Sequence, residues 1–150
     1  VLAGTALPAE LLELELTESA LMDDFDTTVQ TLHELKGIGI NIAVDDFGTG
    51  YSSLSYLKQF PLDRIKIDQS FVRDLDQSME SAEITQAIIT MAHSLNLQVI
   101  AEGVETQHQR AFLIMQNCEE LQGFYFSKPL PQDQAAQLLQ HNLKSHPQVT

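Results

Sequence analysis

Two adjacent carboxylates, Asp45 and Asp46, stand where the apolar run 41–44 meets a glycine-punctuated turn at 47–50. An apolar run bounded by turn residues is typical of a buried strand. Adjacent negative charges repel each other and resist removal from water, so they disfavour folding unless something offsets them. A divalent cation would offset that charge, whereas an Asp-Asp turn that caps the following helix would need no metal. The pair alone supports either interpretation.

The composition of the chain excludes several classes of function. Its 150 residues are 43% hydrophobic and 19% charged, as expected for one globular domain. The net charge is −13, from 21 acidic and 8 basic residues. A protein that binds duplex nucleic acid needs a basic surface, and this chain lacks the residues to form one. The scattered histidines and the single Cys118 show no zinc-site spacing, and we expect Cys118 to be a buried, inert thiol. A phosphate-bearing ligand held through metal ions remains compatible with this charge.

Short apolar strands alternate along the chain with longer helical patterns. We expect strands at residues 11–16, 41–45, 64–68, 97–102 and 121–123, and helices at about 23–36, 52–60, 82–95, 106–116 and 132–139, with a frayed tail after His141. Alternation without hairpin signals predicts a parallel sheet with right-handed crossovers. Both an open doubly wound sheet and the C-terminal part of a (β/α)8 barrel fit this order.

Polar side chains recur near the C-terminal end of every predicted strand, although a helix-covered parallel strand should be apolar on both faces. They are Glu15, Asp45, Lys66, Glu102 and Gln122. Side chains alternate across a strand, so residue parity assigns each of them to a face. In a barrel these groups point to one axis at the top, where barrel active sites lie, whereas in an open sheet they need not converge. The pattern favours an α/β fold of the (β/α)8 TIM-barrel type, truncated here to about five C-terminal strand-helix units.

The acidic members of this set, together with Asp46, offer hard oxygen ligands without thiolate or imidazole, which favours Mg²⁺ or Mn²⁺. Neighbouring carboxylates suit two metal ions about 3.5–4 Å apart that share a nucleophilic water and flank a phosphodiester. Lys66 can hold that water or stabilise negative charge on phosphate oxygens. The alternative is a structural ion-pair network in which Lys66 neutralises Glu15 and Asp45, but one lysine cannot balance four acids.

Five motifs follow one another along the chain. They are residues 15–19 (ELTES), 45–54 (DDFGTGYSSL), 65–72 (IKIDQSFV), 101–106 (AEGVET) and 122–130 (QGFYFSKPL). Together they resemble the EAL domain, over about residues 8–139 of the chain. The resemblance implies a (β/α)8 barrel that uses two Mg²⁺ or Mn²⁺ ions to cut one phosphodiester bond of cyclic di-GMP (c-di-GMP). The product would be linear pGpG, in bacterial second-messenger signalling.

The resemblance also implies a role for each matching residue. Glu15 and Asp45 correspond to ligands of the first metal ion, and Asp46 corresponds to a ligand that is shared with the second ion or belongs to it. Glu102 resembles the glutamate that holds the second ion, directly or through water. Lys66 matches the lysine that contacts the catalytic water and assists its deprotonation.

Other matches concern the substrate and the supporting loops. Gln122 matches a glutamine near the metal waters and the substrate, and completes a catalytic set with Lys66 and Glu102. Glu18 resembles the glutamate that anchors the loop 47–53, which the family uses for dimerisation and control of the metal site. Glu105 resembles a residue that supports the ligands. The segment that lines the guanine and phosphate end of the cleft corresponds to Phe126, Ser127, Pro129 and Leu130.

The family's namesake Glu-Ala-Leu motif and an upstream Asn-x-Ser segment, which both carry metal ligands, have no match in the chain. Five of eight barrel strands are accounted for, so we expect residues 1–150 to be a partial EAL domain, inactive or poorly folded alone. Implied partners are c-di-GMP, a second copy that binds through the loop after Asp46, and diguanylate-cyclase-like (GGDEF) or sensory domains. We expect a cytoplasmic domain, whether or not the longer protein is anchored in a membrane.

Two other functions remain as alternatives. A non-catalytic EAL domain would serve as a c-di-GMP receptor or as a signalling and dimerisation module. An open-sheet nucleotide binder would use the turn Gly48-Thr49-Gly50. That turn lacks the third glycine of a dinucleotide fingerprint, and the adjacent aspartates would repel a bare pyrophosphate, so this function ranks last.

Overall fold

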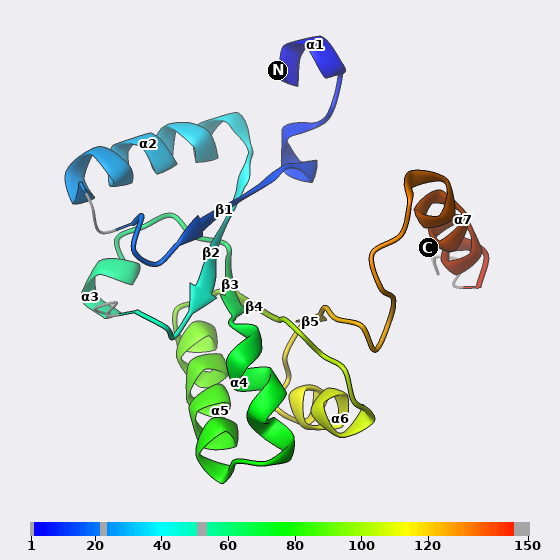
Figure 1. Cartoon of the computed structure of the whole chain (residues 1–150). Helices are drawn as coiled ribbons and strands as arrows, with labels where there is room; N and C mark the ends of the chain where they lie inside the picture. Colours follow the sequence, from blue (N-terminus) through cyan, green and yellow to red (C-terminus); the bar gives the residue numbers. More distant parts are fainter. Residues whose placement is uncertain (1, 22–23, 51–53, 146–150) are drawn as a thin grey trace.

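A parallel sheet in sequence order, β1-β2-β3-β4-β5, forms the centre of the computed structural model (Figure 1). The structure describes residues 2–21, 24–50 and 54–145. Within them the strands are β1 Glu13–Thr17, β2 Asn41–Phe47, β3 Arg64–Ile67, β4 Gln98–Ala101 and β5 Glu120–Leu121. All four strand pairings are parallel, which confirms the predicted sheet type.

Helices connect successive strands and extend beyond the last one. They are α1 Leu2–Thr5, α2 Phe25–Ile38, α3 Leu54–Leu57, α4 Gln69–Arg73, α5 Met79–Ser94, α6 Gln107–Met115 and α7 Gln132–Ser145, with 3-10 turns at Ala9–Leu11 and Asp74–Asp76. In Figure 1, α4, α5 and α6 gather at one end of the sheet, and α7 stands apart at the end of an extended segment. No helix of the described residues is long and apolar enough to cross a bilayer.

Several predicted boundaries were wrong. Strand β2 continues through Asp46 to Phe47, whereas β5 ends before Gln122. Helix α4 was not predicted, because Asp68 was assigned to the strand. Its side chain instead accepts a hydrogen bond from Ser70 N at 3.0 Å and caps α4. Helix α7 passes the predicted fraying point at residue 141 and ends at Ser145.

Alternation along the strands separates an apolar face from a polar face. Residues Ile65 and Ile67 of β3 are fully buried in the core, whereas Arg64 and Lys66 belong to the other face. The core continues through β2, β4 and α5 with Ile42, Val44, Val99, Ile88, Ile89 and Ala92. The polar face is therefore the one that can carry chemistry.

The predicted burial of Cys118 is confirmed, since its side chain is among the buried residues. Burial raises the pKa of Cys118 to about 12, so the thiol stays protonated and unreactive at neutral pH.

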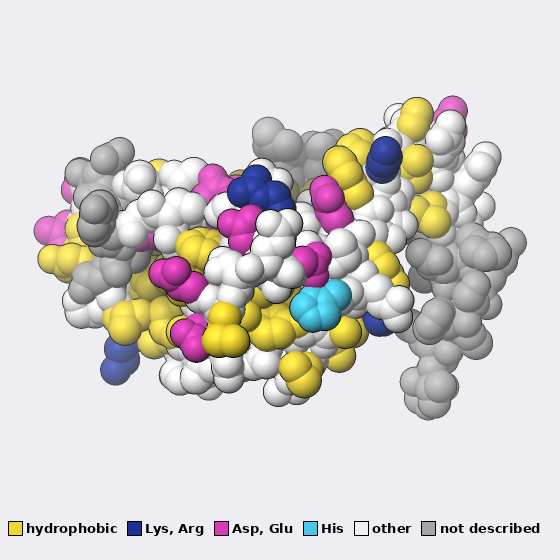
Figure 2. Space-filling view, turned by 60° about the horizontal axis from the view of Figure 1, so that its bottom comes forward, with side chains coloured by type: hydrophobic (Ala, Val, Ile, Leu, Met, Phe, Trp, Pro, Cys, Tyr) yellow, Lys and Arg dark blue, Asp and Glu magenta, His cyan; other side chains and the backbone are white. Residues whose placement is uncertain are grey.

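Acidic residues outnumber basic ones in the chain, by 21 to 8. On the face in Figure 2, acidic side chains lie scattered among hydrophobic and uncharged ones, with few Lys or Arg.

Candidate active site

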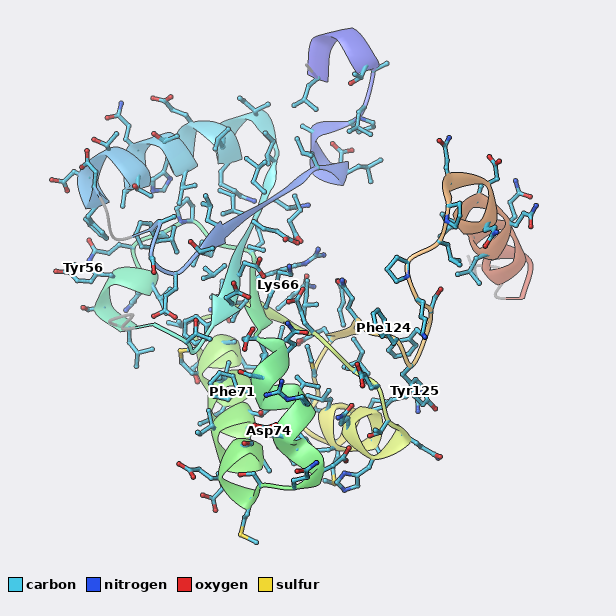
Figure 3. The ribbon with its side chains drawn as sticks, in the orientation of Figure 1. Tyr56, Lys66, Phe71, Asp74, Phe124 and Tyr125 are labelled. Carbon is cyan, nitrogen blue, oxygen red and sulfur yellow. The ribbon has the colours of Figure 1, made fainter. Side chains whose placement is uncertain are left out.

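Lys66 lies at the centre of a group of carboxylates at the C-terminal edge of the sheet (Figure 3). Its side chain is 6% exposed, and its Nζ lies 2.8 Å from Glu15 Oε2, 2.9 Å from Asp45 Oδ1 and 2.8 Å from Glu102 Oε1. The three acids come from β1, from β2 and from the residue that follows β4. Four of the five polar side chains at the predicted strand ends thus meet at one point.

The charge state of Lys66 follows from these neighbours. Burial alone would lower the pKa of Lys66, but contacts with Glu102, Glu15 and Asp45 outweigh burial and raise the pKa above its ordinary value. Lys66 is therefore an ammonium ion at neutral pH. An ammonium ion has no lone pair, so it donates hydrogen bonds and supplies positive charge but cannot accept a proton.

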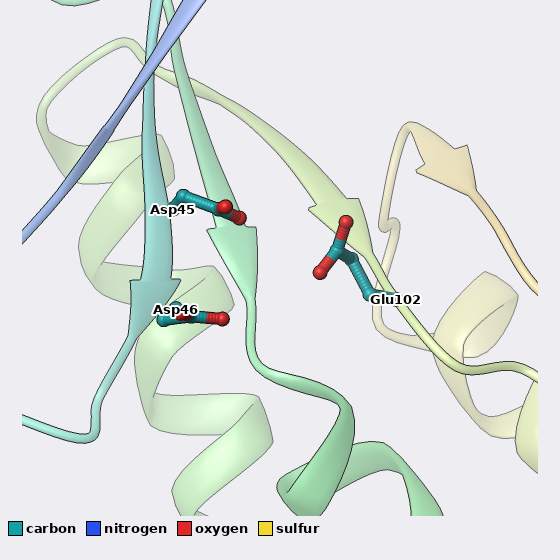
Figure 4. A group of neighbouring side chains, drawn as sticks. All are labelled: Asp45, Asp46 and Glu102. Atoms are coloured by element: carbon teal, nitrogen blue, oxygen red, sulfur yellow. The ribbon is translucent and has the colours of Figure 1, made fainter.

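A bulge in β2 turns Asp46 toward the same group. Three residue steps of β2, from Val44 to Phe47, pair with two steps of β3, and Asp46 has a positive φ of 51°. Strand alternation without a bulge would place Asp45 and Asp46 on opposite faces. Instead, carboxylate oxygens of Asp45, Asp46 and Glu102 lie within 4.8 Å of one another (Figure 4). These three form the acidic triad.

The acidic triad is not electrically balanced by its protein neighbours. Slight burial and the negative charges of Asp45 and Asp68 raise the pKa of Asp46. Oδ1 of Asp45 is buried and lies 2.9 Å from Lys66 Nζ, in the ion pair described above. A divalent cation with oxygen ligands fits this excess of negative charge.

Asp68 is a site residue that the sequence analysis did not single out. It follows β3, and its negative charge contributes to the raised pKa of Asp46. The signal was present in the sequence, because Asp68 stands two positions after Lys66 and shares its parity.

Glu18 anchors the turn that follows β2. Its side chain is 4% exposed, and its Oε2 accepts hydrogen bonds from Gly48 N and Gly50 N, both at 3.3 Å. A Cβ at position 50 would lie 2.9 Å from Glu18 Cδ, so a side chain there would displace the Glu18 carboxylate from these hydrogen bonds. Residues Tyr51, Ser52 and Ser53, at the end of the predicted dimerisation loop, lie outside the described residues.

Two cavities border the cluster around Lys66. The larger, of about 570 Å³, is lined by Glu15, Lys66, Gln122, Phe126, Ser127 and Pro129, among others. The smaller, of about 240 Å³, is lined by Gln69, Glu102, Gly103, Glu105, Gln122, Gly123 and Phe124. Leu130 is 39% exposed and lines neither of these two cavities. Gln122 borders both cavities from the loop after β5, not from within that strand as predicted.

Gly123 packs this loop directly against the loop that follows β4. Val104 N donates to Gln122 O at 3.0 Å, and Tyr125 N donates to Val104 O at 2.9 Å. A Cβ on residue 123 would lie 2.2 Å from Val104 O, which is backbone and cannot move aside cheaply. The missing side chain at Gly123 therefore sets the position of Gln122.

We expect Gly123→Ala to lower the free energy of unfolding by about 1–3 kcal/mol, because the methyl group overpacks two backbones. Gly37→Ala is the matched control, since a Cβ at Gly37 in α2 meets nothing within 4 Å. The control should raise the free energy of unfolding by about 0.5–1 kcal/mol. Urea unfolding of both variants measures the difference. Equal stability of the two variants would contradict the tight packing.

Comparison with known proteins places this geometry in a family. The profile of the EAL domain matches residues 2–129. The chain is 52% identical over 130 residues to the cyclic di-GMP phosphodiesterase NbdA of Pseudomonas aeruginosa, covering 87% of this chain and 17% of NbdA. It is 45% identical over 127 residues to the bifunctional diguanylate cyclase/cyclic di-GMP phosphodiesterase MucR of the same species, covering 85% of this chain and 18% of MucR.

Solved structures share the fold. The chain is similar to the MucR phosphodiesterase in complex with c-di-GMP, with a TM-score of 0.86 and 43% identity over 89% of this chain and 54% of that one. It is also similar to the manganese and c-di-GMP complex of Klebsiella pneumoniae BlrP1, with a TM-score of 0.78 and 36% identity over 85% of this chain and 33% of that one. The five-stranded sheet is thus the C-terminal part of a TIM-type α/β barrel, and the chain belongs to the EAL domain family.

Proposed function

We propose that residues 1–150 are the C-terminal part of an EAL domain that hydrolyses c-di-GMP to linear pGpG with two Mg²⁺ or Mn²⁺ ions. The observation that carries this proposal is the convergence of Lys66 with Glu15 and the acidic triad at the C-terminal edge of the sheet. The names of NbdA and MucR and the c-di-GMP bound to MucR support the same reaction. Since the chain spans 17% of NbdA, the activity is proposed for the complete domain.

In this proposal the carboxylates hold the metal ions. Asp45 and Glu15 would serve the first ion, and Asp46 and Glu102 the second. The manganese in the BlrP1 complex supports the choice of ion. When bound, the ions would activate a water molecule and neutralise charge on the phosphodiester. Without a cation, burial and the negative charges of Asp45 and Asp68 raise the pKa of Asp46.

Lys66 works through its positive charge. Its Nζ can donate hydrogen bonds to the attacking water and to a phosphate oxygen, which orients the water and stabilises developing negative charge. In this proposal the Lys66 ammonium stabilises the hydroxide that forms and so assists deprotonation of the water, while the proton passes to solvent.

The walls of the larger cavity would receive the nucleotide. Phe126, Ser127 and Pro129 combine an aromatic ring, a hydroxyl and an apolar ring beside Gln122. Such groups suit a flat base and a ribose-phosphate edge. Glu105, on the smaller cavity, would support the Glu102 loop.

The remaining partners belong to the longer protein. We propose a homodimer that forms through the loop after Asp46, whose residues Thr49 and Gly50 are exposed. The bifunctional name of MucR supports a neighbouring diguanylate-cyclase-like domain. The proposed substrate, an intracellular messenger, would place the domain in the cytoplasm.

The test is incubation of a complete EAL domain carrying these residues with c-di-GMP and Mg²⁺, followed by chromatography. We expect pGpG to accumulate with Mg²⁺ and not with a chelator, while residues 1–150 alone produce none. Binding of c-di-GMP without turnover would support the receptor alternative instead. Neither binding nor turnover would refute the proposal altogether.

A further inference from the structure

Gln109 is a buried polar side chain that lines neither of the two cavities. It is 3% exposed and lies in the first turn of α6. Its Oε1 accepts a hydrogen bond from Thr106 N at 3.0 Å, while its own backbone N donates to Thr106 Oγ1 at 3.1 Å. These two bonds form a capping box, which any helix can use to satisfy its first N–H groups.

A third hydrogen bond of Gln109 reaches beyond the helix cap. Glu105 N donates to Gln109 Oε1 at 2.7 Å, the shorter of the two bonds to that oxygen. Glu105 precedes the capping residue and belongs to the loop that starts at Glu102. One buried oxygen therefore holds both the helix start and the site loop.

The same loop is held at other points of its length. Glu102 N donates to Ile67 O of β3 at 3.3 Å, and Val104 N donates to Gln122 O at 3.0 Å. Thr106 Oγ1 donates to Asp76 Oδ2 at 3.0 Å. The two hydrogen bonds to Gln109 Oε1 hold the C-terminal end of this loop, at Glu105 and Thr106, which the pairing of β4 with its neighbours does not reach.

We propose that Gln109 is a positioning residue for Glu102, and this rests on the proposed function in which Glu102 holds a metal ion. Gln109 lines neither cavity and acts only through the loop backbone. Removing its acceptor leaves two N–H groups without their partner, so the loop relaxes. The Glu102 carboxylate then loses its fixed place beside Lys66 and the two aspartates.

The test compares three variants of the complete domain by calorimetric titration with Mn²⁺. Gln109→Met keeps the size of the side chain but removes the acceptor, and should weaken Mn²⁺ binding by about 10-fold or more, the range found for groups that orient metal ligands. Gln109→Glu keeps an acceptor oxygen at a helix N-terminus, where negative charge is favourable, and should stay within about 3-fold of the parent. Thr106→Ala removes the cap but keeps the Glu105 bond, so it should lower the melting temperature without changing Mn²⁺ affinity.

The outcomes separate this inference from the proposed function. If the parent domain binds no Mn²⁺ and leaves c-di-GMP intact, the proposed function fails. If the parent binds Mn²⁺ and folded Gln109→Met binds it equally well, only the positioning role fails. Equal weakening in Gln109→Met and Thr106→Ala would reduce Gln109 to a helix cap and overturn the inference. Should Gln109→Met not fold, failure of Gln109→Glu to retain Mn²⁺ affinity would overturn it as well.

Discussion

Replacing Asp45 by asparagine in the complete domain is expected to abolish c-di-GMP hydrolysis at ordinary metal concentrations. Asp45 belongs both to the ion pair with Lys66 and to the acidic triad. Asparagine keeps the shape of the side chain but removes the negative charge that holds a cation. The loss should be about 1,000-fold or more, as when a central electrostatic group of an active site is removed. Glu102→Gln should have an effect of the same order.

The control for this prediction is Glu83→Gln. Glu83 is exposed on α5 and lines neither cavity, but its substitution makes the same change in net charge. We expect its rate of pGpG formation to stay within about twofold of the parent. Assays at several Mg²⁺ concentrations separate weaker metal binding from slower chemistry. An Asp45→Asn variant that retained turnover within a few-fold would refute the ligand assignment.

Lys66→Met should give the second large effect, a fall in kcat of about 100- to 10,000-fold. Methionine fills a similar volume but cannot donate to water or phosphate, and it leaves Glu15, Asp45 and Glu102 without their common cation. We therefore also expect the melting temperature to fall without metal and to recover on addition of Mn²⁺. A fall in kcat together with a melting temperature that recovers with Mn²⁺ would identify the lost positive charge of Lys66 as the cause of both effects.

The pH dependence has a definite sign. The pKa of Lys66 lies above its ordinary value of 10.5, so its stabilising contribution is complete below pH 10.5 and is lost only as pH rises through the higher folded-state value. Near neutral pH this contribution should not change.

The matched control for Lys66→Met is Lys36→Met. Lys36 pairs with Asp63 at 2.7 Å outside the site, so its substitution should affect stability but not kcat. Unchanged kcat in Lys66→Met would contradict the role of Lys66.

Much of the site could be predicted from the alternation of side chains along the strands, but the position of Asp46 could not, because it depends on a bulge in β2. Alternation correctly assigned Glu15 and Lys66 to one face, because both strands are regular where these residues lie. The approach of Asp46 to Glu102 depends on the bulge opposite β3 and on a positive φ. Neither leaves a sequence signal that distinguishes a strand continuing through Asp46 from a turn that begins there.

Helix capping shows a similar limit. Thr106 and Gln109 have the spacing of a capping box, and the prediction of a helix capped by Thr106 is confirmed, since α6 begins at the next residue. The bond from Glu105 N to Gln109 depends on how the preceding loop folds over the helix, which tertiary packing decides. Gln122 was predicted beside the site although its strand boundary was wrong, since a residue just past a strand end still lies at that edge of the sheet.

The most direct test of the two-metal site is Mn²⁺ bound to the complete domain, counted by calorimetry and examined by electron paramagnetic resonance. We expect two Mn²⁺ ions per domain, with the spectrum of a coupled pair about 3.5–4 Å apart. In Asp46→Asn the second ion and the coupling should both be lost. A parent domain that binds one isolated Mn²⁺, or an Asp46→Asn variant that keeps the coupled pair, would contradict the two-metal site.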